Sequence, residues 1–325
     1  MADIFALAAQ NLISPVVLSF ALGLFAALVR SDLSVPEAVA KALSIYLLFA
    51  IGFKGGVSVA DHGIDAGLGL SLLAGVIMSA LIPFIAFGLL RVLSSIDRLN
   101  AAAVAGHYGS ISIVTFVAAT SVLESQGIAA EGYMVAVAAA MEAPAILSAL
   151  WLVSRGSNGH RMDSTLWREI LLNGSIVLLV GSFIIGFATG PEGMEDISGF
   201  IVAPFTGVLC LFLLDMGLVA GRGMQKGHHV LGMGAILFGV LMPVTGSIIG
   251  FGCALLLGLS TGGTLLLMTL SASASYIAVP AAMRVALPEA NPSIYLTLSL
   301  GVTFPFNLVA GIPLYLALAQ AANGG

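Results

Sequence analysis

The amino-acid sequence predicts an all-α polytopic membrane protein with ten transmembrane helices, arranged as a 5+5 inverted repeat. Composition is the first indication, because 59% of the 325 residues are hydrophobic and only 8% are charged, whereas a soluble domain carries about 25% charged residues. The mean hydropathy of +1.10 agrees. The second and third indications are matching motifs in the two halves and a one-sided distribution of basic residues. A net charge of −5 gives no basic patch, which excludes nucleic acid as a partner.

A membrane-spanning helix needs about 20 mainly apolar residues, and the polar breaks of the chain leave ten such segments. The predicted spans are residues 11–29, 38–55, 67–92, 100–122, 133–153, 169–189, 197–219, 229–258, 262–285 and 293–320.

The two halves carry matching residues separated by 161 to 165 positions. The pairs are Phe20 with Phe183, Gly23 with Gly186, Gly52 with Gly217 and Pro144 with Pro305. This self-similarity predicts a first repeat at residues 1–155, a linker at 156–168 and a second repeat at 169–325. Because five spans is an odd number, the second repeat enters the membrane upside down relative to the first.

The basic residues predict the orientation, since short loops that carry Lys or Arg stay in the cytoplasm. With the N-terminus outside, the cytoplasmic ends and loops hold Arg30, Lys41, Arg91, Arg98, Arg155, Arg161, Arg168, Arg222, Lys226 and Arg284. The outer side holds Lys54, which either reaches solvent or pairs with a carboxylate. Both termini are therefore expected on the outer side. The first basic residue is Arg30, so the N-terminus does not resemble a cleaved signal peptide.

Spans four and nine are interrupted by small and polar residues, which predicts broken helices. Residues 106–112 read GHYGSIS and residues 271–275 read SASAS, so the Ser-x-Ser pair that begins at Ser110 recurs at Ser271. A helix that unwinds in the membrane frees backbone groups, which survive only against protein or a wet cavity. Two such breaks would meet near the midplane, where helix N-termini favour an anion and freed carbonyls a cation. Close helix packing is the alternative explanation for such serines.

Two acids and one histidine lie in the interior of predicted spans, away from the span ends. A carboxylate there costs at least ~2.5 to 3.5 kcal/mol and usually marks an ion path or a buried pair. Glu142 is the stronger candidate, because Pro144 frees backbone nearby. Asp215 lies about two turns from Arg222, so a structural role is as plausible as a functional one. His107 either titrates or packs as a neutral, hydrogen-bonded side chain.

With these residues the chain resembles the sodium-dependent bicarbonate transporter family (SbtA-like permeases) over nearly its whole length. The matching segments are residues 106–115, residues 123–127 (LESQG), Glu142 with Pro144, residues 280–284, residues 290–293 and residues 311–315. The resemblance implies a core domain and a scaffold domain, each drawn from both repeats. It also implies a bacterial inner membrane protein, a homotrimer and a PII-like regulatory partner. The central loop is much shorter than in cyanobacterial members, which weakens the inference of that partner.

The resemblance also implies where the ligands bind. The implied anion site comprises Gly109, Ser110, Ile111, Ser112 and Ile113 on the first break and Ser271, Ser273, Ala274 and Ser275 on the second. The candidates for binding Na+ are Thr115, Tyr276 and Glu142. Cyanobacterial members have an acidic residue where this chain has Tyr276, and the positions of Ile113 and Val114 are more polar there. This chain is therefore a non-cyanobacterial type, for which Na+ coupling is open.

The sequence thus predicts a secondary active transporter that imports a small anion, most plausibly bicarbonate, coupled to Na+ and without a cofactor. A small-carboxylate symporter is one alternative. A cation/proton antiporter of the same inverted-repeat class, using Glu142 and Asp215, is another. An intramembrane hydrolase would need a nucleophile with a positioned base, and Ser110 near His107 is a weak indication of one. A passive channel or receptor would not need matching breaks in both halves.

Overall fold

The computed structural model describes residues 13–63, 66–154, 172, 174–227, 231–276, 279–280, 283 and 287–323. The predicted linker at 156–168, and with it Arg155, Arg161 and Arg168, lies outside the described residues, as does Arg284. The described segments are helical and contain no strand. The helices are α2 (Pro15–Leu28), α3 (Glu37–His62), α4 (Ala66–Leu93), α5 (Arg98–Gly109), α6 (Ile113–Ser125), α7 (Met134–Ala140), α8 (Glu142–Ser154), α10 (Gly174–Ile201), α11 (Phe205–Gly227), α12 (Met233–Leu257), α13 (Thr261–Ala272), α15 (Pro292–Leu296), η1 (Thr297–Thr303), α16 (Phe304–Phe306), η2 (Asn307–Gly311) and α17 (Ile312–Ala322).

Eight helical segments of the described chain are long and apolar enough to cross a membrane. They are Glu37–Asp61, Ala66–Leu93, Arg98–Ser125, Met134–Val153, Val177–Ile201, Phe205–Gln225, Met233–Leu257 and Pro292–Ala322. The other two predicted spans, 11–29 and 262–285, contain the shorter apolar helices Pro15–Leu28 and Thr261–Ala272. Apolar side chains face outward, as expected against lipid: Val92 is 83% exposed and Leu256 is 88% exposed. The chain is therefore a multi-pass membrane protein.

α10 consists of two helices that meet at a kink. Gly190 has φ 59° and ψ −155°, which is not helical, and Pro191 follows it. Because glycine adopts this backbone conformation readily, the first helix ends before Gly190, where the sequence predicted the end of a span at residue 189, and a second helix continues to Ile201. The start of the next span was predicted wrongly, at 197, because α11 begins at Phe205.

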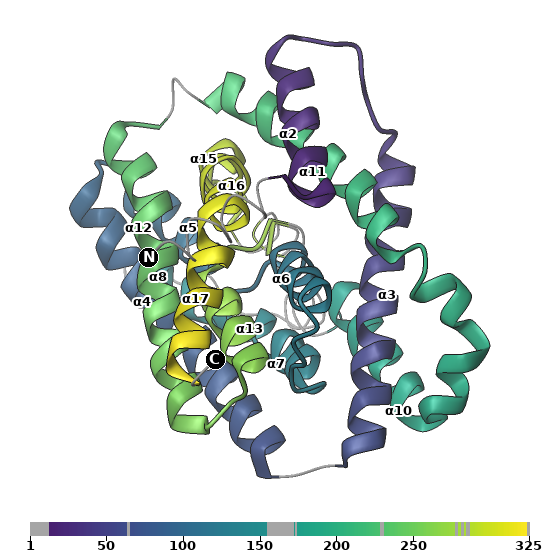
Figure 1. Ribbon diagram of the computed structural model, residues 1–325. Coiled ribbons are helices and arrows are strands. Elements are labelled where there is room, and N and C mark those ends of the chain that lie inside the picture. The colour runs from purple at the N-terminus through teal and green to yellow at the C-terminus, as the bar shows by residue number, and fades with distance from the viewer. Residues whose placement is uncertain are drawn as a thin grey trace.

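Two helix pairs form one side of the molecule. α3 packs along α10, and α2 packs along α11 (Figure 1). We call these four helices the α3–α10 group. Its pairs are held close by glycines: a Cβ on Gly56 would overlap the carbonyl oxygen of Phe183, and one on Gly186 would overlap that of Phe53. Small residues that let two backbones approach are a common basis of helix association in membranes.

The remaining helices form a second group, with α4, α5 and α8 on one side and α12, α13 and α17 on the other (Figure 1). α5 and α13, which carry the two predicted breaks, are the most enclosed, since every residue from Ala101 to Gly109 and from Gly262 to Ala272 is buried. The predicted breaks therefore lie inside protein, as freed backbone in a membrane requires.

α5 and α13 have the same length and matching ends. Each has 12 residues, and the caps Asp97 and Ser110 of α5 correspond to Ser260 and Ser273 of α13. Both C-terminal caps are extended, with φ and ψ of −83° and 171° for Ser110 and −88° and 165° for Ser273. This correspondence is an offset of 163 residues, and it pairs Ser112 with Ser275. The sequence had predicted an offset of 161 by matching Ser110 with Ser271. That prediction paired residues of the same type, whereas the structure pairs the ends of the two helices.

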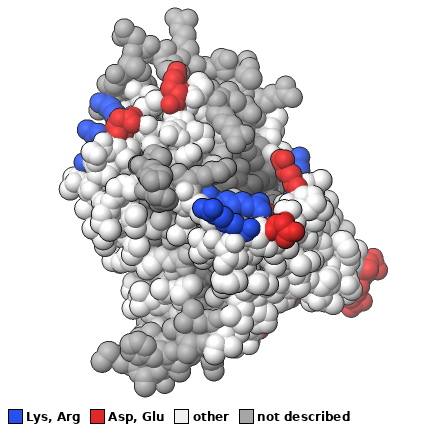
Figure 2. Space-filling view, turned by 90° about the horizontal axis from the view of Figure 1, so that it is seen from above, with Lys and Arg blue, Asp and Glu red and all other residues white. Residues whose placement is uncertain are grey.

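Basic residues lie at one end of the helices. Arg30 follows α2, Arg91 lies in the last turn of α4, Arg98 begins α5, and Arg222 lies near the end of α11. Figure 2 looks down on the end where α2 connects to α3, and it shows described Lys and Arg side chains beside described acidic ones. Lys54 lies in the opposite half of α3.

Candidate substrate site

The first break is a three-residue extended segment between α5 and α6. α5 ends at Gly109, and Ser110 and Ser112 both have extended backbone conformations. The Ser112 hydroxyl accepts a hydrogen bond of 3.2 Å from the backbone N–H of Thr115 and so caps α6. A serine cap satisfies one of the free N–H groups at the start of a helix. The break therefore ends in a defined helix N-terminus.

The second break follows α13. The Ser273 hydroxyl donates to the carbonyl of Leu270 at 2.9 Å. The Ser275 hydroxyl accepts from the N–H of Val279 at 3.3 Å, as Ser112 does for Thr115. Ser273, Ala274 and Ser275 are each at most 2% exposed. The local structure of the second break thus repeats the capping found at the first.

The two breaks contact each other directly. The N–H of Ser112 donates to the hydroxyl of Ser273 at 2.8 Å, and the N–H of Ser275 donates to the carbonyl of His107 at 2.8 Å. His107 Nδ1 lies 2.6 Å from the carbonyl oxygen of Ser275. We call this contact the crossing. It brings together residues more than 160 positions apart, and all four are buried.

Several buried polar atoms among the described residues have no hydrogen-bond partner. They are the hydroxyls of Ser71, Ser110, Thr115, Thr269 and Tyr276, His107 Nε2 and Glu142 Oε2. Buried polar groups are nearly always paired, so such atoms need an explanation, and an absent ion or ligand is one. Ser110 belongs to the first break, Thr115 lies in the first turn of α6, and Tyr276 directly follows Ser275. Three of these unpaired oxygens therefore lie in or next to the two breaks in the sequence.

Other predicted site residues are engaged elsewhere. The Ser271 hydroxyl donates to the carbonyl of Leu267 at 2.9 Å on its own helix and lies 3.6 Å from Met78 Sδ, so it faces α4 and not the first break. Asp215, on α11, interacts electrostatically with the positively charged Arg222. His107 stacks on Tyr295 with ring centroids 4.4 Å apart, which supports the packed, hydrogen-bonded interpretation. Ile111 and Ile113 contribute backbone and apolar surface.

The structure reveals one residue at the break that the sequence analysis missed. Asn307 Nδ2 donates at 2.8 Å to the carbonyl of Ala272, the last residue of α13, and the Tyr315 hydroxyl donates to Asn307 Oδ1 at 2.9 Å. Asn307 begins η2, one of two π-helical segments in this part of the chain. π-helical turns often mark functional sites. The sequence feature that could have indicated Asn307 is a polar amide inside the apolar segment predicted as a span at 293–320.

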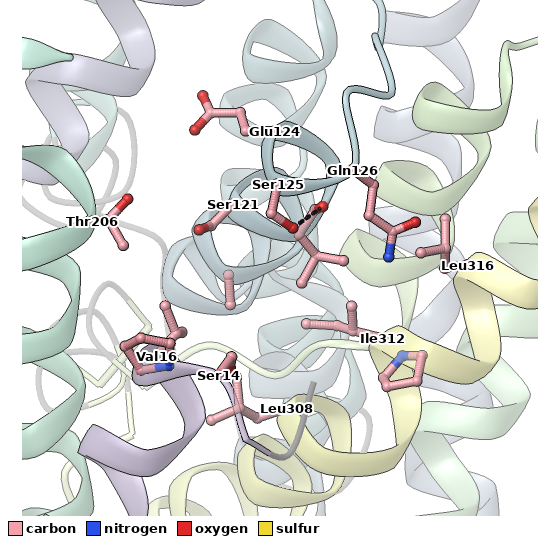
Figure 3. Close-up of a pocket in the computed structure, with 14 residues that line it drawn as sticks. Ser14, Val16, Ser121, Glu124, Ser125, Gln126, Thr206, Leu308, Ile312 and Leu316 are labelled. Atoms are coloured by element: carbon pink, nitrogen blue, oxygen red, sulfur yellow. Dashed lines mark hydrogen bonds between the residues drawn. The ribbon is translucent and has the colours of Figure 1, made fainter. Parts of the chain in front are cut away.

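Two cavities are lined by residues that follow the two breaks in the sequence, α6 after the first and Tyr276 after the second. One, of about 490 Å³, is lined by the end of α6, the start of α2, Thr206 of α11, Leu308 and the start of α17. Figure 3 shows Glu124 and Thr206 on one side of it and Ile312 and Leu316 on the other. The second, of about 420 Å³, lies between α11, α15 and η1, and Tyr276 forms part of its wall.

An ion pair joins α3 to α6 near the first cavity. Lys54 Nζ lies 3.0 Å from Glu124 Oε1 and 4.5 Å from the centroid of the Phe205 ring. The alternative that Lys54 pairs with a carboxylate is thereby confirmed. The pair links the α3–α10 group to the helix that follows the first break.

Breaking this ion pair is expected to have a small effect, because the Lys54 and Glu124 side chains are 23% and 47% exposed. Exposed pairs contribute about 0.2–1 kcal/mol. Lys54→Gln and Glu124→Gln should each lower the midpoint of thermal unfolding of the purified protein by a few degrees at most. The charge swap Lys54→Glu with Glu124→Lys should recover part of the loss, since the swap restores the pair but not the cation–π contact with Phe205. No recovery in the swap would show that the two charges do not interact.

These features together are those of a helical multi-pass membrane transporter: apolar spanning helices, two of them broken, whose breaks meet in the protein interior. The family model for the Na+-dependent bicarbonate transporter superfamily matches residues 15–320, and the chain therefore belongs to this superfamily. The resemblance drawn from the sequence is confirmed. The superfamily consists of transporters, so the chain is not an enzyme. No curated protein matches the chain.

Proposed function

We propose that this protein is a secondary active transporter that imports bicarbonate together with Na+ through the crossing of the two breaks. The observation that supports this most is the hydrogen bond from the Ser112 N–H to the Ser273 hydroxyl, together with the buried hydroxyls without partners at Ser110, Thr115 and Tyr276, in or next to the two breaks. Because the chain belongs to the Na+-dependent bicarbonate transporter superfamily, we assign these polar groups to a bound anion and a neighbouring Na+.

The anion binds at the start of α6 in this proposal. α6 is 13 residues long, and its N-terminus begins at the crossing. The free N–H groups and the dipole of a helix N-terminus stabilise negative charge. The backbone from Gly109 to Ile113 and the segment from Ser273 to Ser275 surround the ligand, and the Ser110 and Ser112 hydroxyls orient it. Ser271 supports the break from the opposite side of its helix.

Na+ would be held by oxygen atoms next to the anion. Candidate ligands are Thr115 Oγ1, Glu142 Oε2 and the Tyr276 hydroxyl, all of which are buried without a partner. Unwound backbone carbonyls coordinate Na+ in transporters of this general design. Glu142 is 4% exposed and lies at the start of α8. A cation beside it would offset the large cost of a buried carboxylate.

The proposed architecture is ten spans in a five-plus-five inverted repeat. The matched ends of α5 and α13 support it, as does the reciprocal packing in which α2 lies along α11 and α3 along α10. The α3–α10 group would be the scaffold domain and the second group the core domain that moves against it. Two inverted halves allow outward-open and inward-open states of similar energy. We place both termini outside the bacterial inner membrane, and we expect a homotrimer and a PII-like partner by resemblance alone.

The alternative of a cation/proton antiporter is less well supported. Asp215 lies on α11 and interacts with Arg222, and it has no hydrogen bond to either break among the described residues. A symporter for another small carboxylate remains compatible with the crossing, because its anionic group is chemically similar to bicarbonate.

The test is uptake of radiolabelled bicarbonate into proteoliposomes, with an inward Na+ gradient and with K+ replacing Na+ as the control. Acetate and other small carboxylates serve as competitors. Uptake that requires Na+ supports the proposal. Uptake that is equal in K+ removes Na+ coupling and makes protonation of Glu142 the next question. Absence of bicarbonate uptake, with uptake of another carboxylate, would replace the substrate and retain the site.

A further inference from the structure

The cavity of about 420 Å³ between α11, α15 and η1 has a distinctive composition. Its walls are mainly apolar, with Met216 and Val219 from α11 and Leu296 and Leu300 from the C-terminal part of the chain. Arg222 is the only charged side chain among the described residues that line it. The residue itself is exposed, so an anion pairs with its guanidinium where water also reaches it.

Arg222 is held in place by its surroundings. Its Nη2 donates to the carbonyl oxygen of Leu33 at 2.8 Å, which leaves the other guanidinium N–H groups available. Asp215, seven residues earlier on α11, is the acidic group that interacts with it. Asp215 does not line the cavity. Ser293 and Thr297 also line the cavity and carry hydroxyl groups.

Tyr276 also lines this cavity. Its side chain is 8% exposed and packs edge-on against Phe304, with ring centroids 5.5 Å apart. The hydroxyl of Tyr276 interacts with the Ser112 side chain, although it has no hydrogen bond of normal geometry. Tyr276 therefore contacts both the cavity and Ser112 of the crossing.

We propose that this cavity is a second anion site, at which Arg222 binds the anion after it has passed Tyr276 on its way to the cytoplasm. The inference rests on the proposed function and extends it. Its ligand is a small monovalent oxyanion, bicarbonate or a carboxylate, whose charge pairs with the guanidinium. The guanidinium fork suits a planar oxyanion in a way that an ammonium group does not.

In this proposal the cavity binds the anion on one side of the membrane only. Loss of the site should therefore change the half-saturation concentration on that side and not on the other. Half-saturation concentrations for radiolabelled bicarbonate are measured in proteoliposomes of defined orientation, once with substrate on the Arg222 side and once with substrate on the opposite side. Arg222→Gln, whose amide can still donate to Leu33, is expected to raise the half-saturation concentration on the Arg222 side roughly 5- to 10-fold. On the opposite side it should stay within about 2-fold of the wild-type value.

Arg91→Gln is the matched control, because Arg91 also donates to a backbone carbonyl, that of Ile96 at 2.7 Å, but does not line the cavity. It should leave both values unchanged. Arg222→Lys should fall between Arg222→Gln and wild type. A second variant, Ser293→Asp, places a negative charge in the cavity. An aspartate is favourable in the first turn of a helix, and Ser293 lies in the first turn of α15, so this variant should fold. It should raise the same one-sided value if the site exists.

An equal change on both sides in Arg222→Gln would overturn the inference, since it would show that Arg222 acts on the whole fold through Leu33. No change on either side, in Arg222→Gln and in Ser293→Asp, would also overturn it. Failure of the proposed function is distinguishable, because the wild-type protein itself would then transport no bicarbonate and no small carboxylate.

Discussion

Replacing Ser273 by alanine is expected to raise the half-saturation concentration for anion uptake by about 5- to 100-fold, the equivalent of about 1–3 kcal/mol. The Ser273 hydroxyl accepts the hydrogen bond from the Ser112 N–H, and both residues are at most 3% exposed. Without the hydroxyl, a buried N–H group is left unpaired at the proposed anion site, and the two breaks lose a direct connection. The measurement is initial uptake rate against bicarbonate concentration in proteoliposomes that contain equal amounts of folded protein.

Ser271→Ala is the control for this prediction. Ser271 lies on the same helix and is equally buried, but its hydroxyl donates to Leu267 within α13. Such a bond to the preceding turn adds little to helix stability, so the half-saturation concentration should change by less than about 3-fold. If Ser273→Ala and Ser112→Ala both transport with the wild-type half-saturation concentration, the anion does not bind at the crossing.

The second large effect is expected from Gly56→Ala or Gly186→Ala in the α3–α10 group. Each new methyl group would overlap a backbone carbonyl of the facing helix, that of Phe183 or of Phe53. Backbone cannot move aside as a flexible side chain can, so the helices must separate. Overpacking of this kind typically costs about 1–3 kcal/mol. Each variant should therefore show a lower midpoint of thermal unfolding in detergent, followed as loss of the monodisperse protein.

The double variant tests the geometry more sharply. Gly56 and Gly186 lie at the same contact between α3 and α10, so separation forced by one methyl group makes room for the other. The loss in the double variant should therefore be smaller than the sum of the two single losses. Gly181→Ala is the control on α10, because a Cβ there meets nothing within 4 Å. An effect of Gly181→Ala as large as that of Gly186→Ala would contradict the close packing.

The sequence determined much of the fold because membrane helices depend on local properties. A run of apolar residues predicts a span wherever it occurs, and eight of the ten predicted spans correspond to helices of membrane length. The breaks were predictable for the same reason. Small and polar residues interrupt a helix locally, and the interruptions appear at Ser110–Ser112 and Ser273–Ser275. The resemblance to the transporter family rested on those same segments.

Where local signals compete, the sequence was less reliable. Glycine and proline at 190 and 191 indicated the end of a span, and the backbone at Gly190 is not helical, but the next span was predicted to begin at 197 and α11 begins at Phe205. The matching serines suggested an offset of 161, whereas the helix caps correspond at 163, because helix length and caps follow the fold and not the position of a single residue type.

Only the tertiary structure decided which polar groups meet. The sequence treated Ser271 and Ser273 alike, yet one hydroxyl faces α4 and the other reaches Ser112. It likewise missed Asn307 and the cavity at Arg222. Hydropathy and helix breaks are properties of neighbouring residues and can be read along the chain. A hydrogen bond between Ser112 and Ser273 depends on how helices from distant segments pack, because a side chain's direction is fixed by its place on the helix and by the neighbour that the fold brings to it.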